Sequence, residues 1–366
     1  MPLNELPTIV VLACDRPISL SSLLGSLAAA NYAGCGAIAL VISIDGSGDD
    51  EVARVARSFH WKLGPKHLIS HSHRLGLKEH VLACGDLTAE YGSIVMLEDD
   101  LLVSPQFYQY ALQALPFYQS DPCVAGISLY SFIYNEFAHV PFGAIDDGND
   151  VYFVQSGVSW GQIWTAGQWA AFRRWLEVNS SVESFTAVPK AVSQWPATSW
   201  KKFFNAYMVA AGKYFVVPRF AMSTNMGEAG THFPQQVTYF TAPLSLRRTH
   251  FRFLPLAQSK CRYDAFFEME PACLKELAPA LPDCDLCVDL NGTKALSQMH
   301  AEYVLSPRSA SDPLMTFGLR HMPPALNIVL AARGDFFRLA RRENLRELPE
   351  EKMKKPRSFF KGPFSG

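Results

Sequence analysis

Residues 94–100 read Ile-Val-Met-Leu-Glu-Asp-Asp, four apolar residues followed at once by three carboxylates. The apolar run is typical of a strand buried on both faces, so it predicts a parallel sheet with Glu98, Asp99 and Asp100 at the carboxyl end of one strand. Open parallel sheets bind their ligands at that edge. Three adjacent carboxylates repel one another unless a positive charge lies among them, and a divalent cation shared with nucleotide phosphates would supply it. The alternative is a solvated loop after a core strand.

Two more apolar runs end in polar clusters. Residues 8–13 are followed by Asp15 and Arg16, and residues 37–44 are followed by Asp45. Helices are expected over residues 19–30, 51–59 and 78–89, and a further strand over residues 214–219. Strands that alternate with helices predict an α/β fold with a mostly parallel sheet flanked by helices. The polar clusters would then meet at one edge of the sheet, which indicates a ligand site there.

The composition describes an ordinary globular chain. Its 366 residues fit two compact units, or one large α/β unit with an appendage. A formal net charge of −1 argues against a nucleic-acid-binding protein, which would carry a basic excess. No apolar stretch approaches the ~20 residues that span a bilayer, and the N-terminus lacks a signal-peptide pattern. We therefore expect a cytoplasmic protein, and its mostly scattered cysteines agree with free thiols in a reducing compartment.

The glycine-containing loop at residues 45–48 matches neither phosphate-binding fingerprint. It lacks the third glycine of the dinucleotide motif, and the pattern G-x-x-x-x-G-K-[ST] occurs nowhere in the chain. A dehydrogenase and a P-loop nucleoside triphosphatase are therefore disfavoured. A nucleotide site built from carboxylates and a metal ion remains.

Aromatic residues gather in the second half of the chain. Six of the seven tryptophans lie within residues 160–200. Aromatic side chains this dense either build a core or line a groove in which sugar rings stack on indole faces, and both alternatives stay open. The basic end of the chain, residues 352–361, is either a disordered tail or a peripheral contact with a membrane surface.

Several short motifs occur in an order that resembles metal-dependent nucleotide-sugar glycosyltransferases of the GT-A fold. They are Ala13-Cys14-Asp15-Arg16, Asp45, Arg74-Leu75-Gly76-Leu77-Lys78, Glu98-Asp99-Asp100, Ser159-Trp160-Gly161 and Gly230-Thr231-His232. The resemblance spans about residues 8–235. It looks closest to N-acetylglucosaminyltransferases of the alpha-1,3-mannosyl-glycoprotein type and to bacterial surface-polysaccharide glycosyltransferases.

This resemblance implies a GT-A, Rossmann-like sheet with a smaller C-terminal extension. Residues 1–150 would form the half that binds the nucleotide-sugar, and residues 151–245 the half that binds the acceptor. Residues 246–366 would form the extension with its basic tail. The membrane contact, if made, would be at the inner face of the membrane.

The resemblance also implies which acids do the chemistry. Asp100 and His232 would bind Mn²⁺ or Mg²⁺, while Glu98 and Asp99 would hold sugar and ribose hydroxyls of the donor. In relatives an Asp follows the tryptophan equivalent to Trp200 and acts as the general base, but this chain has Lys201 there. We therefore expect Glu228, in the loop before His232, to be the base, with Asp99 as the other catalytic candidate.

The donor would be a nucleotide-sugar, a UDP-sugar foremost. The resemblance places Asp45 at the uracil edge and His80 near the base. Arg16, Arg74 and Lys78 would neutralise phosphate charge, because guanidinium groups match the geometry of phosphate oxygens.

The implied activity is sugar transfer to a hydroxyl of a glycan or of a lipid-linked saccharide, by direct displacement with inversion, in bacterial surface polysaccharide or glycan assembly. Two rival functions stay open. A sugar-1-phosphate nucleotidyltransferase would need a Gly-rich, basic first loop, which residues 14–17 do not provide. A non-catalytic nucleotide-sugar-binding protein would explain Lys201.

Overall fold

The computed structural model describes residues 6–46, 50–179, 181, 185–227 and 238–346. Within them a nine-stranded sheet has the order β13-β9-β11-β6-β10-β4-β1-β2-β3. In that order its strands span Arg262–Tyr263, Val151–Val154, Tyr214–Pro218, Val124–Ser128, Gln162–Thr165, Ser93–Glu98, Thr8–Ala13, Leu40–Ile44 and Lys66–Ser70. Strand β10 is antiparallel to both neighbours and β9 is antiparallel to β11, while the other adjacent pairs are parallel.

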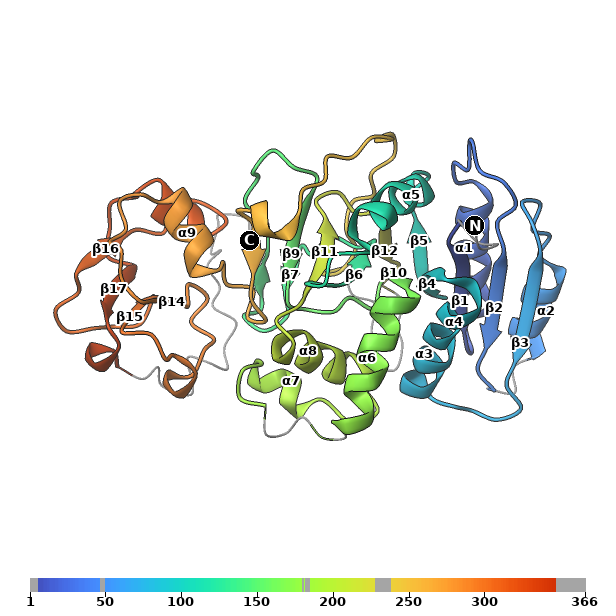
Figure 1. Cartoon of the computed structure of the whole chain (residues 1–366), viewed down its shortest axis with the longest axis horizontal. Helices are drawn as coiled ribbons and strands as arrows, with labels where there is room; N and C mark the ends of the chain where they lie inside the picture. The colour runs from blue at the N-terminus through green and yellow to red at the C-terminus, as the bar shows by residue number, and fades with distance from the viewer. Residues whose placement is uncertain (1–5, 47–49, 180, 182–184, 228–237, 347–366) are drawn as a thin grey trace, which may run out of the picture.

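Helices cover both faces of this sheet (Figure 1). In chain order the helices are α1 (Pro17–Ala28), α2 (Asp50–Ser58), α3 (Leu77–Asp86), α4 (Thr88–Tyr91), α5 (Phe107–Tyr118), α6 (Ala166–Val178), α7 (Lys190–Gln194), α8 (Trp200–Ala210), α9 (Pro271–Leu277) and α10 (Ala325–Val329). Leucines of α1 and aromatic residues of α5 pack on one face, and apolar residues of α3, α6 and α8 pack on the other. The predicted α/β class, with a mostly parallel sheet flanked by helices, is confirmed.

Strands β1 and β4 are buried on both faces, as their unbroken apolar runs predict. Val10 and Leu12 join the apolar core on one side of the sheet, whereas Ile9 and Val11 join the core on the other side. Successive side chains of a strand point to opposite faces, so both faces require apolar residues. The polar residues after these strands are therefore the first that can reach solvent or a ligand.

Most predicted elements differ from the observed ones by one to three residues at their ends. The strand at residues 8–13 is confirmed in full. The strand predicted over 37–44 begins only at Leu40, and the helix predicted over 78–89 is divided into α3 and α4 at Leu87. The antiparallel strands β9 and β10 were not expected, because four-residue runs are too short to show periodicity.

Three of the clustered tryptophans build the core rather than a groove. Trp164, Trp169 and Trp200 are each no more than 2% exposed and pack against phenylalanines of α6 and α8. Gly85 of α3 makes room for one of them, because a Cβ atom there would overlap the Trp169 ring. Trp160 and Trp195 are less buried than these three.

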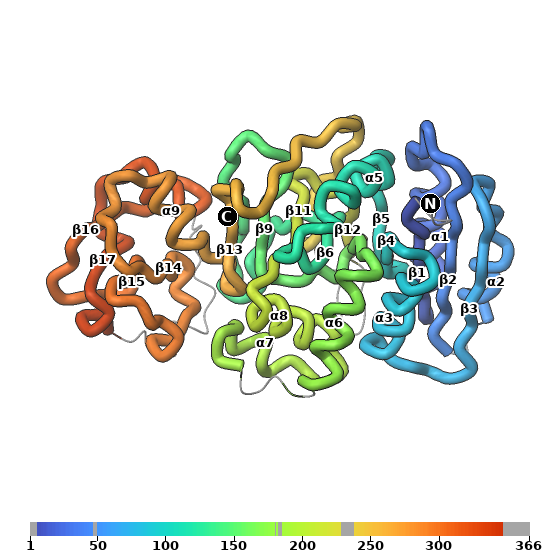
Figure 2. The backbone as a smooth tube through the Cα atoms, viewed as in Figure 1, coloured from blue at the N-terminus to red at the C-terminus, as the bar shows by residue number. Residues whose placement is uncertain are grey.

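The C-terminal part of the chain forms a second, smaller sheet. Its order is β14-β15-β17-β16, and Figure 1 shows it at the end of the molecule opposite β3. These strands span Leu286–Val288, Tyr303–Ser306, Phe337–Arg341 and Met315–Phe317. Strand β13 still belongs to the large sheet, where Figure 2 shows it beside β9. The predicted boundary at residues 245/246 stays a prediction. No helix of the described residues is long and apolar enough to cross a membrane.

Four short strands of the described residues lie outside these two sheets. They are β5 (Leu101–Val103), β7 (Tyr134–Asn135), β8 (Val140–Pro141) and β12 (Ser223–Asn225), and three 3-10 helices span Leu256–Gln258, Leu296–Gln298 and Arg342–Asn344. Strand β5 pairs with β12 and β7 pairs with β8, in both cases antiparallel. The β5–β12 pair directly follows the acidic end of β4, so it brings residues 223–225 to that edge.

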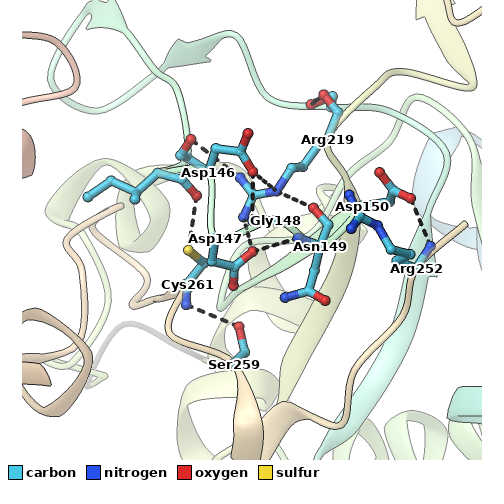
Figure 3. Close-up of polar contacts among 12 residues, drawn as sticks. Asp146, Asp147, Gly148, Asn149, Asp150, Arg219, Arg252, Ser259 and Cys261 are labelled. Carbon is cyan, nitrogen blue, oxygen red and sulfur yellow. Dashed lines mark hydrogen bonds and ion pairs between the residues drawn. The ribbon is translucent and has the colours of Figure 1, made fainter. Parts of the chain in front are cut away.

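An arginine after β11 holds an acidic loop in place (Figure 3). The Arg219 side chain is 10% exposed and forms an ion pair of 2.8 Å with Asp147, whose side chain is 5% exposed. Its Nε also donates to the carbonyl oxygen of Asn149 at 2.7 Å. Oxygens of Asp147 and Asn149 consequently lie around the guanidinium group of Arg219. This group supplies the positive charge that the acid-rich loop requires.

Replacing Arg219 by methionine should lower the free energy of unfolding by about 3–5 kcal/mol, because it leaves a buried carboxylate without its cation. The control is Arg341→Met, which breaks a 2.6 Å ion pair with Glu302 whose side chains are about half exposed. That change should cost at most about 1 kcal/mol. Guanidinium unfolding followed by tryptophan fluorescence measures both. Equal effects of the two variants would contradict the role of Arg219.

Candidate functional site

The ends of β1 and β4 meet through an arginine. These strands are adjacent and parallel, with Leu12 opposite Glu98, so the residues after them lie side by side. Arg16 Nη1 lies 2.6 Å from Asp100 Oδ2 and 3.8 Å from Asp99 Oδ1. The backbone N–H of Cys14 donates to Asp99 Oδ2 at 3.1 Å. The predicted convergence of these two polar clusters is therefore present.

The acids at this edge are poorly solvated. Burial raises the pKa of Asp99 to about 7, although the Cys14 N–H and Arg16 act in the opposite direction. Burial, and next the charges of Asp100 and Asp99, raise the pKa of Glu98 well above its ordinary value. A single guanidinium group thus lies among three carboxyl groups, and it offsets only part of the cost of burying them.

Two carboxylate oxygens of this cluster fit the metal ion that the resemblance implies. Glu98 Oε1 and Asp100 Oδ1 are buried and have no hydrogen-bond partner among the described residues. Carboxylate oxygens are the ligands that Mg²⁺ prefers, usually together with substrate phosphates and water. Within the part of the chain that the structure describes, no three His, Cys, Asp or Glu side chains form a ready metal site. Among the described residues, the agreement with a metal site therefore rests on these two oxygens.

Asp45 holds the loop that carries Arg74. Its Oδ1 accepts the backbone N–H of Leu75 at 2.6 Å, and its Oδ2 accepts the N–H of Gly76 at 3.1 Å. Gly76 has a φ of +80°, a conformation that glycine adopts without strain. The Asp45 residue is 3% exposed. This carboxylate is therefore already engaged by the backbone, a contact that the sequence does not reveal.

The loop brings Arg74 to the strand ends. Arg74 Nη2 lies 3.6 Å from Asp15 Oδ2, and both side chains are more than half exposed. Lys78 in the first turn of α3 extends its Nζ over the Phe203 ring of α8, 4.5 Å from the ring centroid. Arg16 and Arg74 thus contact acids that follow β4 and β1, whereas Lys78 contacts α8, and exposed Arg74 is available to a ligand.

His80 lies inside the protein instead of at the surface of the site. It is 4% exposed, and its Nε2 lies 2.8 Å from Ser43 Oγ. The ring of His71 packs against it edge-on, with centroids 5.5 Å apart. Burial lowers the pKa of His80 to about 4, so the side chain is neutral at pH 7.

Lys201 has a partner that the sequence did not suggest. Its Nζ lies 2.6 Å from Glu136 Oε1, and the two side chains are 14% and 25% exposed. The same ammonium lies 5.1 Å from the centroid of the Trp195 ring. Glu136 escaped the sequence analysis because it lies in no motif, 65 residues before Lys201. Only the packing of α8 brings the two together.

The remaining predicted site residues are the base and the second metal ligand. Glu228 and His232 lie outside the described residues, as do residues 352–361. The chain that leads to them is described up to Gly227, and the N–H of Met226 donates to the carbonyl oxygen of Asp100 at 3.0 Å. That contact extends the pairing of β12 with β5. The roles of Glu228 and His232 stay predictions.

The burial of His80 predicts a pH dependence. The unfolded chain binds a proton on this residue near pH 6.5, whereas the folded protein does so only near pH 4. The unfolded state therefore takes up more protons between these values, and the free energy of unfolding falls as the pH drops from 6.5 to 4. Two to three pKa units correspond to a loss on the order of 3–4 kcal/mol.

His80→Gln should remove that part of the acid destabilisation, and His60→Gln, at an exposed position, should not. Thermal melts of the wild type and both variants at pH 7, 5.5 and 4.5 measure the effect. Parallel pH profiles for the wild type and His80→Gln would show that His80 is not responsible.

Comparisons with known proteins report similarity in structure only. No protein-family model and no curated protein sequence matches the chain. Residues 1–349 of TarS from S. aureus match with 11% identity over 59% of this chain and 59% of that one, at a TM-score of 0.39. The complex of TarS 1–349 with UDP-GlcNAc gives 10% identity over 69% and 61%, at 0.40. The mannosyltransferase PcManGT from Pyrobaculum calidifontis, in complex with GDP-Man and Mn²⁺, gives 12% identity over 60% and 57%, at 0.35. This chain spans less than two thirds of the length of each of these structures.

Proposed function

We propose that this protein is a glycosyltransferase that binds a nucleotide-sugar at the carboxyl edge of β1 and β4. The observation that carries the proposal is the pair of buried, unpartnered oxygens, Glu98 Oε1 and Asp100 Oδ1, among the described residues beside the guanidinium of Arg16. Leaving such acceptors unsatisfied costs about 1–3 kcal/mol each or more for charged groups, so a ligand with donors or a cation is expected to satisfy them. The hydroxyl groups of a sugar and of a ribose can donate hydrogen bonds to these two oxygens.

The cations around this edge fit the diphosphate of such a donor. Arg16 is fixed by Asp100 and Asp99, and the loop anchored by Asp45 presents Arg74. Lys78, four residues after Arg74, would add a third positive charge. Positive groups held in place before the reaction stabilise the negative charge that develops on the leaving diphosphate.

The proposed metal is Mn²⁺ or Mg²⁺, held by Asp100 and, outside the described residues, by His232. When bound there, it would supply Lewis-acid assistance to the departure of the diphosphate. The chain's own groups bind and orient the donor: Glu98 and Asp99 receive its hydroxyls, and Arg16 keeps the Asp100 carboxylate in position.

The finer features of the proposal come from the resemblance. The donor is a UDP-sugar carrying a hexose or an N-acetylhexosamine, and the acceptor is a hydroxyl of a glycan or of a lipid-linked saccharide. Transfer proceeds by direct displacement with inversion, with Glu228 or another acid as the base, in the assembly of surface polysaccharide at the cytoplasmic side of the membrane.

Release of UDP tests the function against its two rivals. The protein is incubated with UDP-glucose, UDP-galactose and UDP-GlcNAc and with Mn²⁺, without an added acceptor. A transferase releases UDP slowly because water replaces the acceptor. A nucleotidyltransferase consumes UDP-sugars only when pyrophosphate is added. A non-catalytic binder retains UDP affinity and releases nothing, and that result would refute the proposed activity.

Asp100→Asn should weaken the Mn²⁺-dependent binding of UDP at least roughly tenfold, since changes even to residues that only support metal ligands cost about 10–100-fold. The asparagine keeps an oxygen for Arg16, so folding should survive. Asp335→Asn, which removes one acid of an exposed ion pair with Arg338, is the control. Calorimetry with UDP, with and without Mn²⁺, measures both. Unchanged affinity for UDP in the Asp100 variant would remove this residue from the proposed metal site.

Asp45→Asn should destabilise the loop at residues 71–76, because the amide group then turns a donor toward the N–H of Leu75 or Gly76. The expected loss of unfolding free energy is about 1–3 kcal/mol. Calorimetry with UDP and with inorganic pyrophosphate separates its two possible roles. If Asp45 acts by holding Arg74 in place, both ligands weaken together. Weakening of UDP alone would show that Asp45 contacts the uracil, as the resemblance implies.

A further inference from the structure

The ion pair between Lys201 and Glu136 occupies the place where relatives of the resemblance carry their base. Lys201 lies in the first turn of α8, and Ser199 caps that helix by accepting the N–H of Lys202. The ammonium group is held at 2.6 Å by Glu136 and at 5.1 Å from the Trp195 ring. An ammonium group has no free electron pair and cannot accept a proton, whereas the carboxylate group of Glu136 can.

This ion pair lies close to the acidic edge of the sheet. Lys201 is among the charges that act on the carboxyl group of Glu98, where it favours ionisation. Helix α8 is tied to α3 where Lys78 extends over Phe203. Lys201 and Arg16 are thus both among the charges that act on Glu98.

Four aromatic side chains form a connected group, one of them two residues before Glu136, and we call them the aromatic shelf: Tyr134, Trp160, Tyr239 and Phe240. Tyr134 stacks on Tyr239 with centroids 5.7 Å apart, and its ring meets Phe240 edge-on at 5.8 Å. Phe240 in turn lies 4.7 Å from Trp160. Tyr239 is 63% exposed, which is unusual for a large aromatic ring.

The aromatic shelf is joined to the acidic edge by hydrogen bonds. Ser223 of β12 donates its hydroxyl to the carbonyl oxygen of Trp160, and just beyond β12 the N–H of Met226 donates to the carbonyl oxygen of Asp100. Behind Trp160 packs Tyr130, with centroids 4.7 Å apart. The hydroxyl of Tyr130 is buried without a hydrogen-bond partner among the described residues, although the residue is only 1% exposed. Within the described residues, buried polar atoms without a partner thus occur both at the acidic edge and beside Trp160 of the shelf.

We infer that Glu136 removes the proton from the acceptor hydroxyl, and that the acceptor is a saccharide whose ring rests on the aromatic shelf. This inference rests on the proposed function. The acceptor oxygen forms a bond to the anomeric carbon of the donor while the bond from that carbon to the diphosphate breaks. The diphosphate leaves with the electron pair, and the acceptor proton passes to the Glu136 carboxylate. Lys201 positions that carboxylate and stays protonated throughout.

The environments of the nearby acids favour this choice. In the proposed function Glu98 and Asp99 receive hydroxyls of the donor, and Asp99 also accepts the N–H of Cys14 at 3.1 Å. Asp100 is engaged by Arg16. Glu136 is partly exposed, has the ammonium group of Lys201 at one oxygen and comes two residues after Tyr134, whose ring belongs to the aromatic shelf.

The test compares Glu136→Gln, Glu136→Asp and Glu228→Gln with the control Glu302→Gln. The control removes a glutamate that forms an ion pair of the same 2.6 Å length in the small sheet. The probes are UDP-GlcNAc, UDP-glucose and UDP-galactose with Mn²⁺, with water or with the methyl glycosides of glucose, galactose and N-acetylglucosamine as acceptors. Because water must also lose a proton, UDP release without any sugar acceptor already reports on the base.

Glu136→Gln should release UDP roughly 100-fold more slowly than the wild type, since general-base catalysis contributes about 10²–10⁴. Its affinity for UDP should stay within about threefold, and Glu136→Asp should recover part of the rate. Unchanged release by Glu136→Gln, or a loss confined to Glu228→Gln, would overturn the inference and leave the proposed function intact. A wild-type protein that neither binds UDP nor releases it would overturn the proposed function itself.

The binding of saccharides to the aromatic shelf is tested by a separate measurement. Saturation-transfer NMR with the three methyl glycosides should give signals with the wild type and with Leu330→Ala, a matched change at an exposed apolar residue of the C-terminal part. Tyr239→Ala should lose these signals while retaining UDP affinity. Signals of equal strength in both variants would show that sugars do not rest on the shelf.

Discussion

The ion pairs of Arg16 with Asp99 and Asp100 are the contacts on which the site depends. A strand buried on both faces ends in three carboxylates, and burying such charges is costly unless a cation shares the space. Residues that come after an adjacent parallel strand can reach this point, because parallel strands end at the same edge. Arg16 follows β1, the parallel neighbour of β4, and its guanidinium reaches Asp100 at 2.6 Å. The positive charge that the acidic sequence requires is thus partly supplied by the chain itself.

Buried acids are paired with arginine side chains elsewhere in the protein as well, but the acids at the end of β4 differ from them. Arg219 matches Asp147 in the acidic loop, and fully buried Arg308 lies 3.4 Å from fully buried Asp289 in the C-terminal part. Each of these acids is paired with a neighbouring arginine, which is how folded proteins make buried charge tolerable. At the end of β4, Glu98 and Asp100 each keep a buried oxygen without a partner within the described ranges, and Asp147 keeps one as well. The β4 edge differs in that two such oxygens belong to one acidic cluster beside the guanidinium group of Arg16, so that one ligand could satisfy both.

Two further contacts restrict side chains of the proposed site. Asp45 engages the backbone of the loop before α3 with its carboxylate and so determines where Arg74 lies, which makes it a supporting residue in the observed fold. The residue after β7, Glu136, and Lys201 of helix α8 hold each other in an ion pair. Short hydrogen bonds to backbone groups and well-packed rings restrict both segments, and such restriction is needed to orient two substrates.

The sequence by itself determined the central strands, the helices between them and the edge at which the acids lie. Unbroken apolar runs of this length fit buried strands, and adjacent parallel strands bring their C-terminal neighbours to one place, so residues 8–16 and 94–100 were sufficient to bring Arg16 near the acids. The sequence also showed that a positive charge was needed among them, but not that Arg16 would be that charge. The tertiary structure decided this, together with the engagement of Asp45, the burial of His80 and the pairing of Lys201 with Glu136. These contacts join residues 30 to 85 positions apart through side-chain direction and helix packing. None of them leaves a local pattern in the chain, because sequence periodicity records which face is buried and not which residues it meets.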